Sequence, residues 1–246
     1  ARDSTANYTT AVGSEAVFKT TGDANTGVGY RTLMCNTSGT ANVGLGYQAG
    51  CVNSTGSCNT SIGYRSLRNA TTASNNTAVG GNALCANTTG SENVAVGTIV
   101  LDANTTGASN TGVGHEALSG NTTGIRNTAV GLGSMYTNTT GGCNTSLGYA
   151  SLGSNTTGTD NTAAGLCALN ANTTGANNVA VGAESLKVNT TGSNSVAVGR
   201  QSLDANTTGQ KNTAVGQGSL GVNTTANDNT TVGNSSLSNN TTGASN

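Results

Sequence analysis

The sequence lacks several residue types on which an ordinary globular core depends. It contains no proline, no tryptophan and one phenylalanine among 246 residues, and aromatic residues make up 3% of the chain. Charged residues make up 8% of the chain, far below the share in a typical globular domain. The core must therefore be built from small and aliphatic side chains.

Charge clusters and long apolar runs are also missing, and each absence excludes a class of partner. Nine basic and ten acidic residues give a formal net charge of −1, and neither sign forms a run. A surface for nucleic acid or an anionic membrane would need clustered Lys and Arg. No apolar stretch approaches the roughly 20 residues of a membrane-spanning helix, and the first residues lack the apolar region of a signal peptide. We therefore expect no nucleic acid and no membrane insertion.

What the sequence does contain is a fixed repeat. The glycine of a Thr-Ala-Val-Gly step recurs at a constant 17-residue spacing from Gly29 to Gly233, and a single shorter, 16-residue interval separates Gly13 from Gly29. Numbering each copy from the residue four before this glycine makes residues 76–92, NTAVGGNALCANTTGSE, one complete repeat. Self-similarity at a short fixed period indicates an architecture in which each unit buries its apolar face against its neighbours.

Two aliphatic positions stay in register through fourteen copies, which argues against a disordered low-complexity chain. Position 4 is Val, Leu, Ile or Ala throughout, and position 9 is Leu in eleven copies. A repeat of this length is too short for a helical hairpin and fits one coil of a solenoid. We therefore predict an all-β fold, a parallel β-solenoid of about fourteen 17-residue coils. A short N-terminal lead, residues 1–8, would precede one continuous array over residues 9–246.

The pattern inside one repeat predicts its cross-section. Alternation at positions 2 to 4 predicts a strand with Thr77 and Val79 in the core and Ala78 on an outer stripe. Positions 8 and 9 predict a second short strand with Leu84 inward, and NTTG at positions 12 to 15 predicts a turn or a third edge. The outer stripe of small residues would be either a contact with other copies or a site that merely tolerates small side chains.

The steps NSVAVG at residues 194–199 and NVAVG at residues 93–97 and 178–182 carry a resemblance to a known family. They resemble the head repeats of trimeric autotransporter adhesins and of related fibre-like bacterial and phage surface proteins. Those heads are left-handed parallel β-rolls of three chains that bind extracellular matrix and host surfaces. The resemblance implies an extracellular or cell-surface rod without enzymatic activity. Adhesin head repeats are shorter, so handedness and trimer formation do not transfer with it.

Position 12 begins an Asn-Thr/Ser-Thr/Ser tripeptide in twelve copies, and each tripeptide is an N-glycosylation sequon. The alternative is an Asn ladder, in which side-chain amides bond from coil to coil. Asn and Thr would be kept for stacking alone, yet a ladder does not require hydroxyl residues at both following positions. The candidate glycosylation sites are Asn36, Asn53, Asn87, Asn104, Asn121, Asn138, Asn155, Asn172, Asn189, Asn206, Asn223 and Asn240.

Six cysteines give a limited prediction. Cys35 and Cys51 fall at positions 11 and 10 of successive copies, so stacking places them within reach of a disulfide bond. The remaining four, Cys58, Cys85, Cys143 and Cys167, have no cysteine on an adjacent coil and are expected to be free or intermolecular. No Cys/His cluster with metal-ligand spacing occurs, so we expect no metal site.

Aromatic and catalytic side chains add little more. Tyr30, Tyr47 and Tyr64 share position 6 of three successive copies and are predicted to stack, either as surface packing or as a platform for a sugar. The sole histidine, His115, has Glu116 as its charged neighbour, and acids are scattered about one per coil. We therefore assign no catalytic or cofactor-binding residue and expect no enzyme.

Together these patterns predict a structural subunit of an extracellular fibre or surface appendage, with glycans as a candidate modification. Stacked coils leave a sheet edge at each end of an array, so we expect copies to associate end to end, laterally, or both. The alternative function is an adhesin head that binds extracellular matrix or glycans. A third is an ice-binding solenoid, for which the adjacent Thr pair at positions 13 and 14 is unfavourable because neighbouring side chains point apart.

Overall fold

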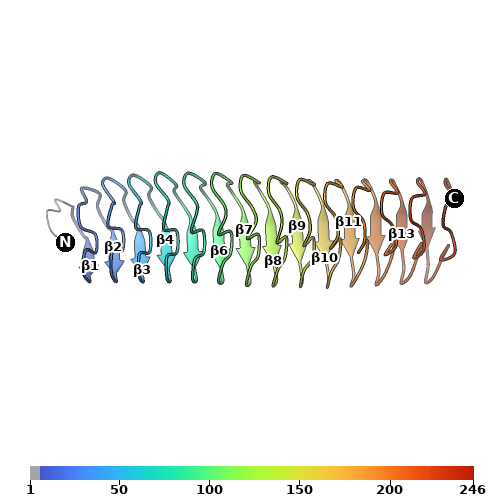
Figure 1. The fold of residues 1–246 in the computed structure, drawn as a ribbon, viewed down its shortest axis with the longest axis horizontal. Coiled ribbons are helices and arrows are strands. Elements are labelled where there is room, and N and C mark those ends of the chain that lie inside the picture. The colour runs from blue at the N-terminus through green and yellow to red at the C-terminus, as the bar shows by residue number, and fades with distance from the viewer. Residues whose placement is uncertain (1–5) are drawn as a thin grey trace. The chain divides into compact units, whose positions relative to one another are not determined.

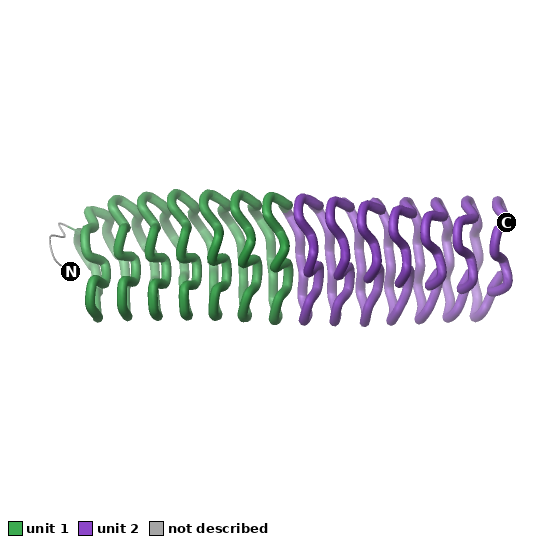
Figure 2. Tube along the Cα trace, in the orientation of Figure 1, with its two compact units in different colours: residues 1–125 green, residues 126–246 purple. Residues whose placement is uncertain are grey.

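The computed structural model describes residues 6–246, which form fourteen short parallel strands and no helix. The chain divides into two compact units, Ala1–Ile125 and Arg126–Asn246, shown in two colours in Figure 2. Each unit is a parallel β-solenoid with one strand per coil, which confirms the predicted fold class. Residues 1–5 of the predicted N-terminal lead lie outside the described residues. Asn7, also in that lead, accepts a hydrogen bond from the backbone N of Ala24 (3.0 Å).

In the first unit, each three-residue strand pairs in parallel with the next strand along the chain (Figure 1). The pairing of Thr77 with Val94 and of Val79 with Val96 sets the register at one full repeat. The strands are β1 (Thr10–Val12), β2 (Thr26–Val28), β3 (Val43–Leu45), β4 (Thr60–Ile62), β5 (Thr77–Val79), β6 (Val94–Val96) and β7 (Thr111–Val113).

The second unit repeats the same pattern. Its seven strands pair in parallel and in chain order, for example with Thr162 opposite Val179 and Ala163 opposite Ala180. The strands are β8 (Thr128–Val130), β9 (Thr145–Leu147), β10 (Thr162–Ala164), β11 (Val179–Val181), β12 (Val196–Val198), β13 (Thr213–Val215) and β14 (Thr230–Val232).

The second strand predicted at positions 8 and 9 does not form. Leu84, at position 9, has φ of 52°, and Leu186 and Leu203 have φ of 48° and 52°. This left-handed backbone cannot continue a strand, and it turns the chain at this corner of the coil. The prediction that Leu84 points inward is confirmed, because its side chain is completely buried. Where position 9 carries Leu, burial of that side chain offsets the cost of the left-handed conformation, roughly 1–2 kcal/mol.

The strand faces the core with the opposite side from the one predicted. Ala78, at position 3, is completely buried, whereas Thr77 and Val79 are half-buried on the outside. The reason is the thinness of the coil, whose interior behind the strand is already filled by positions 8 and 9. A Cβ added to Gly44, at position 3, would lie 3.2 Å from Cγ of Leu33. Position 3 is accordingly Gly, Ala or Ser in thirteen of the fourteen strands, and the larger residues at positions 2 and 4 turn outward.

The single shorter interval, between Gly13 and Gly29, is absorbed in the bend at positions 12 to 15. Strand β1 keeps its register with β2, pairing Thr10 with Thr26. Thr20 takes the place of the Asn at position 12, and its Oγ1 accepts a hydrogen bond from Nδ2 of Asn36 (3.1 Å). The bend can therefore lose a residue without displacing the strand.

Candidate functional site

The outward side chains of the strands form an uncovered face on each unit, which we call the outer sheet face and define by positions 2 and 4. None of the fourteen strands found in residues 6–246 contains a charged residue. In the second unit, Leu147 is 43% exposed and Val130 is 38% exposed. Further large apolar side chains that are exposed on these faces are Val12, Val43, Leu45, Val96, Val181 and Val232.

Glycine at position 5 brings position 6 beside this face. Gly80 has φ of 133°, and a Cβ placed on it would lie 2.1 Å from the carbonyl oxygen of Gly97 in the next coil. No other residue type allows this approach. The chain turns immediately after the strand, and the exposed side chains of Leu132, Tyr149 and Leu166 at position 6 extend the apolar surface.

Tyr30, Tyr47 and Tyr64 form the predicted ladder in the first unit. Their ring centroids are 5.4 and 5.3 Å apart, with interplanar angles of 25° and 12°. The guanidinium carbons of Arg31 and Arg65 lie 5.0 Å from the centroids of Tyr30 and Tyr64, respectively. Because the ring faces cover one another, they are not presented to solvent as a flat platform. The geometry therefore favours surface packing over sugar stacking.

The Asn residues at position 12 form a buried ladder. Nδ2 of Asn172 donates to Oδ1 of Asn155 (2.9 Å) and to the carbonyl oxygen of Gly175 (3.0 Å), and Nδ2 of Asn189 donates in turn to Oδ1 of Asn172 (2.9 Å). Eleven of the twelve candidate Asn residues are at most 2% exposed, and Asn240 is partly exposed. A glycan on Nδ2 would replace a donor of this ladder inside a closed coil. Occupancy of these sequons stays a prediction, which the folded geometry disfavours.

Sequence reasoning missed a second Asn ladder at position 1. Nδ2 of Asn144 donates to Oδ1 of Asn127 (3.1 Å) and to the carbonyl oxygen of Gly158 (2.9 Å). The same Gly158 oxygen accepts from Nδ2 of Asn155 in the position-12 ladder (3.0 Å). The glycine at position 15 therefore joins the two ladders across the coil. The recurrence of Asn at position 1 in twelve of the fourteen copies was the signal that could have revealed it.

The two Thr residues that follow position 12 have different environments. At position 13, Oγ1 of Thr156 donates to the carbonyl oxygen of Thr173 in the next coil (3.0 Å), and this pattern recurs along both units. At position 14, Thr157 is exposed, and within the described residues its hydroxyl has no protein partner. The position-12 ladder and the position-13 hydrogen bonds thus explain why Asn and the first Thr recur in each coil. They do not explain why the second Thr recurs.

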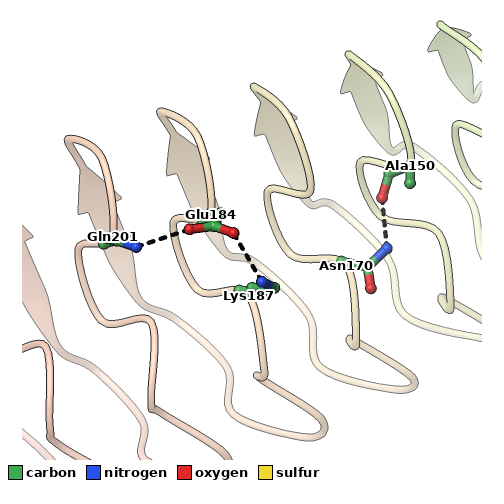
Figure 3. Close-up of polar contacts among 5 residues, drawn as sticks. All are labelled: Ala150, Asn170, Glu184, Lys187 and Gln201. Carbon is green, nitrogen blue, oxygen red and sulfur yellow. Dashed lines mark hydrogen bonds and ion pairs between the residues drawn. The ribbon is translucent and has the colours of Figure 1, made fainter.

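Charged and amide side chains meet at the corner between positions 7 and 10 (Figure 3). Nζ of Lys187 lies 2.8 Å from Oε1 of Glu184, and Nε2 of Gln201 in the next coil donates to Oε2 of Glu184 (2.8 Å). The bond from Lys187, followed by that from Gln201, holds the pKa of Glu184 below its usual value. In Figure 3, Nδ2 of Asn170 also donates to the carbonyl oxygen of Ala150 in the preceding coil (2.7 Å).

Cys35 and Cys51 are backbone neighbours as predicted, since the N–H of Cys35 donates to the carbonyl oxygen of Cys51 (3.0 Å). Both thiols are free in the structure, and the disulfide between them stays a prediction. Cys51 is buried, whereas Cys35 is exposed. Burial raises the pKa of the Cys51 thiol, which keeps it protonated and weakly nucleophilic at neutral pH.

The sole histidine of the chain lies beside one acidic residue. Nδ1 of His115 lies 3.7 Å from Oε2 of Glu116 at an exposed corner. In that part of the chain, no three His, Cys, Asp or Glu side chains gather as metal ligands, and no helix is long and apolar enough to cross a membrane. Comparison with protein families, with curated proteins and with solved structures gave no match for the chain.

Proposed function

We propose that the chain is a structural subunit of an extracellular fibre or surface appendage whose copies associate through the outer sheet face. That face carries the proposal, because every described coil adds the same two uncovered side-chain positions and its strand adds no charge. An extended uncharged face on which Thr and exposed aliphatic side chains recur in every coil can pack against a second sheet. The two sheets would lie about 10 Å apart.

A second copy of the chain is the partner that fits this face best. Any partner has to match one strand per coil, at a spacing of about 4.8 Å, along the coils of a unit. Another copy supplies that spacing from its own coils. The outward Thr and Val side chains are branched at Cβ and lose little freedom when a partner covers them. End-to-end association belongs to the same proposal, because one copy can continue the parallel register of another.

The resemblance to adhesin head repeats supports an extracellular or cell-surface location without enzymatic activity. It also supplies the competing proposal, a discrete head that binds matrix or glycans. The Tyr30–Tyr47–Tyr64 ladder adds no support for glycan stacking, because its ring faces cover one another. An ice-binding surface is the third possibility. The outer sheet face pairs Thr128 with Val130, a Thr-x-Val pattern that lacks the second hydroxyl of a Thr-x-Thr surface.

Electron microscopy and sedimentation of the purified full chain test the proposal. The informative variant replaces two outer-face residues with lysine, Val130→Lys and Leu147→Lys. Its matched control is Asn177→Lys with Asn194→Lys, which adds the same charge at position 17, an exposed position where Lys211 occurs naturally. We expect fibres or lateral bundles from the wild type and from the control, and single particles from the outer-face variant.

Each other outcome has a defined meaning. A wild-type chain that stays monomeric at every concentration contradicts self-association. Short particles of defined length and a fixed number of chains favour the adhesin head over the fibre. Equal assembly of both lysine variants shows that the outer sheet face is not the contact. Thermal hysteresis of freezing in the wild-type solution, lost in the outer-face variant, would assign the face to ice instead.

A further inference from the structure

Position 14 carries a hydroxyl residue in every coil of full length. These side chains, which we call the hydroxyl column, are all exposed, and within the described residues none of their hydroxyls has a protein hydrogen-bond partner. They lie in the bend after position 12 and outside the strands, so the outer sheet face does not include them. The hydroxyl column consists of Ser38, Thr55, Thr72, Thr89, Thr106, Thr123, Thr140, Thr157, Thr174, Thr191, Thr208, Thr225 and Thr242.

Exposure at other corners of the coil lets the side chain vary widely. Position 6 changes among Ser, Tyr, Gly, Thr, His, Leu, Ala, Arg, Gln and Asn along the chain, and position 17 changes among Ala, Cys, Asn, Glu, Ser, Arg, Lys and Asp. Position 14 does not vary in this way, although its side chains are exposed and, within the described residues, their hydroxyls have no protein hydrogen-bond partner. The repeats therefore retain the hydroxyl group for a reason outside the fold of the single chain.

Completion of an N-glycosylation sequon does not account for this retention. The Asn at position 12 is buried, and Nδ2 of Asn172 already donates two hydrogen bonds. One coil separates the two explanations: position 12 is Ala70, which cannot carry a glycan, yet Thr72 is kept at position 14. The hydroxyl residue is thus retained where the asparagine is lost.

We infer that the hydroxyl column is a glycan attachment site, with sugars linked to the side-chain oxygen of Thr or Ser and not to Asn. The inference rests on the proposed extracellular role, since it requires a glycosyltransferase and a sugar activated as a nucleotide- or lipid-linked diphosphate. In the transfer, Oγ1 of Thr forms a bond to the anomeric carbon while the bond from that carbon to the phosphate oxygen breaks. The diphosphate leaves with the electron pair, and the hydroxyl proton passes to a base of the transferase.

The spacing of the column determines what the attached sugars form. Within each unit, successive hydroxyls belong to successive coils, about 4.8 Å apart. Sugars on neighbouring coils would therefore touch one another and cover the bend with a continuous row. Because the row lies outside the outer sheet face, it leaves that face available to a second copy.

Mass spectrometry of the full chain from the cells that make it tests the inference. We expect an intact mass above the 23.9 kDa of the bare chain. The added mass should survive peptide-N-glycosidase, which cleaves sugars from Asn, and be lost in mild alkali, which eliminates sugars from Thr and Ser. A thiol added during the elimination should tag position 14, Thr72 included. A bare mass, removal of all sugar by the glycosidase, or tags confined to other positions would each overturn the inference.

Two adjacent substitutions in the coil of Ala70 sharpen the test. Thr72→Val removes the hydroxyl of the column and no sequon, whereas Thr71→Val removes the sequon that begins at Asn69 and leaves the column intact. We expect Thr72→Val to abolish the glycan on this peptide and Thr71→Val to retain it. The reverse result would place the sugar on Asn69 and overturn the inference.

These experiments distinguish a failure of the glycan inference from a failure of the proposed fibre function. Fibres built from bare chains would leave the proposed function standing and remove the glycan inference. Glycans mapped to the hydroxyl column of a chain that never assembles would do the opposite.

Discussion

Gly112 lies opposite Val100 inside the first unit, and each residue has the size that the other allows. Val100 is the only valine at position 8 among the described coils, and a Cβ added to Gly112 at position 3 of the next coil would lie 2.6 Å from its Cγ1. One pair of coils shows the converse: position 8 is the small residue Ala83, and position 3 of the next coil, Ala95, carries a Cβ. At Gly112, the core is therefore matched in volume to the side chain of Val100 in the preceding coil.

This complementarity predicts a coupled pair of substitutions. Gly112→Ala should lower the free energy of unfolding by about 1–3 kcal/mol, because the new methyl group overpacks the core. Adding Val100→Ala should remove most of that loss, a non-additivity visible in a double-mutant cycle followed by urea unfolding. Gly81→Ala is the control, since its nearest atom would be Cγ2 of Thr98 at 3.8 Å. Equal losses with and without Val100 would contradict the packing.

Adjacent alanines in β10 test which side of the strand faces the core. Ala163, at position 3, is completely buried, and Ala164, at position 4, is half-buried on the outer sheet face. Ala163→Val should destabilise the chain by about 1–3 kcal/mol through overpacking. Ala164→Val restores the residue common at position 4 and should change stability by no more than about 0.5 kcal/mol. Thermal unfolding of the two variants compares them directly, and the reverse order would restore the orientation predicted from the sequence.

The position-12 ladder should be sensitive to the loss of one amide. Asn172→Ala leaves the Oδ1 of Asn155 and the Nδ2 of Asn189 without their partner, at a cost of about 1–3 kcal/mol for each group left unpaired. Thr174→Ala destroys the same sequon without touching the ladder and should be close to neutral. Denaturant titration of unglycosylated protein measures both. Similar stability of the two variants would show that the ladder contributes little.

Burial of the Asp102 carboxyl group should make the stability of the fold depend on pH. Burial is the largest influence on this carboxyl group and raises its pKa above the ordinary value, against the opposing effect of backbone hydrogen bonds from its own N–H and that of Ala103. The folded state therefore binds the proton more tightly than the unfolded state. The contribution of Asp102 to the free energy of unfolding is therefore largest below the unfolded-state pKa of its carboxyl group. That contribution is lost as pH rises through the folded-state pKa.

Asp102→Asn should consequently raise the thermal midpoint at pH 7. The gain should shrink as pH falls into the acidic range where Asp102 itself becomes protonated. Asp160→Asn, at an exposed corner, is the matched control with the same change of charge. A gain that does not depend on pH, or that both variants share, would show that burial of the Asp102 carboxylate is not its cause.

Much of the fold could be predicted from the repeat because a stacked core requires every coil to place the same residue type at the same point. Leu84 and its equivalents identified one inward position correctly. The alternation around Ala78 could not decide which side of the strand is inward, since a period of two fits either face. That choice depends on the thickness of the coil, which the left-handed turn at Leu84 and the two Asn ladders determine together.

The candidate site was predictable to a smaller degree. The sequence could mark Asn172 and Thr174 as parts of one sequon, but burial of the amide and exposure of the hydroxyl appear only in the folded coil. The neighbourhood of Cys35 and Cys51 followed from spacing alone.

The register of the strands also determines how such a chain can fold. Parallel sheets usually join strands that are far apart in sequence, and the loops to be closed make them slow to form. Here Thr77 pairs with Val94 and Val94 with Thr111, so each new pairing closes a loop of the same short length. Within each unit, a coil that has formed offers a complete template to the repeat that follows it. Folding can therefore advance by repeated addition, with a nucleation step that is met once and a propagation step that is the same for every coil.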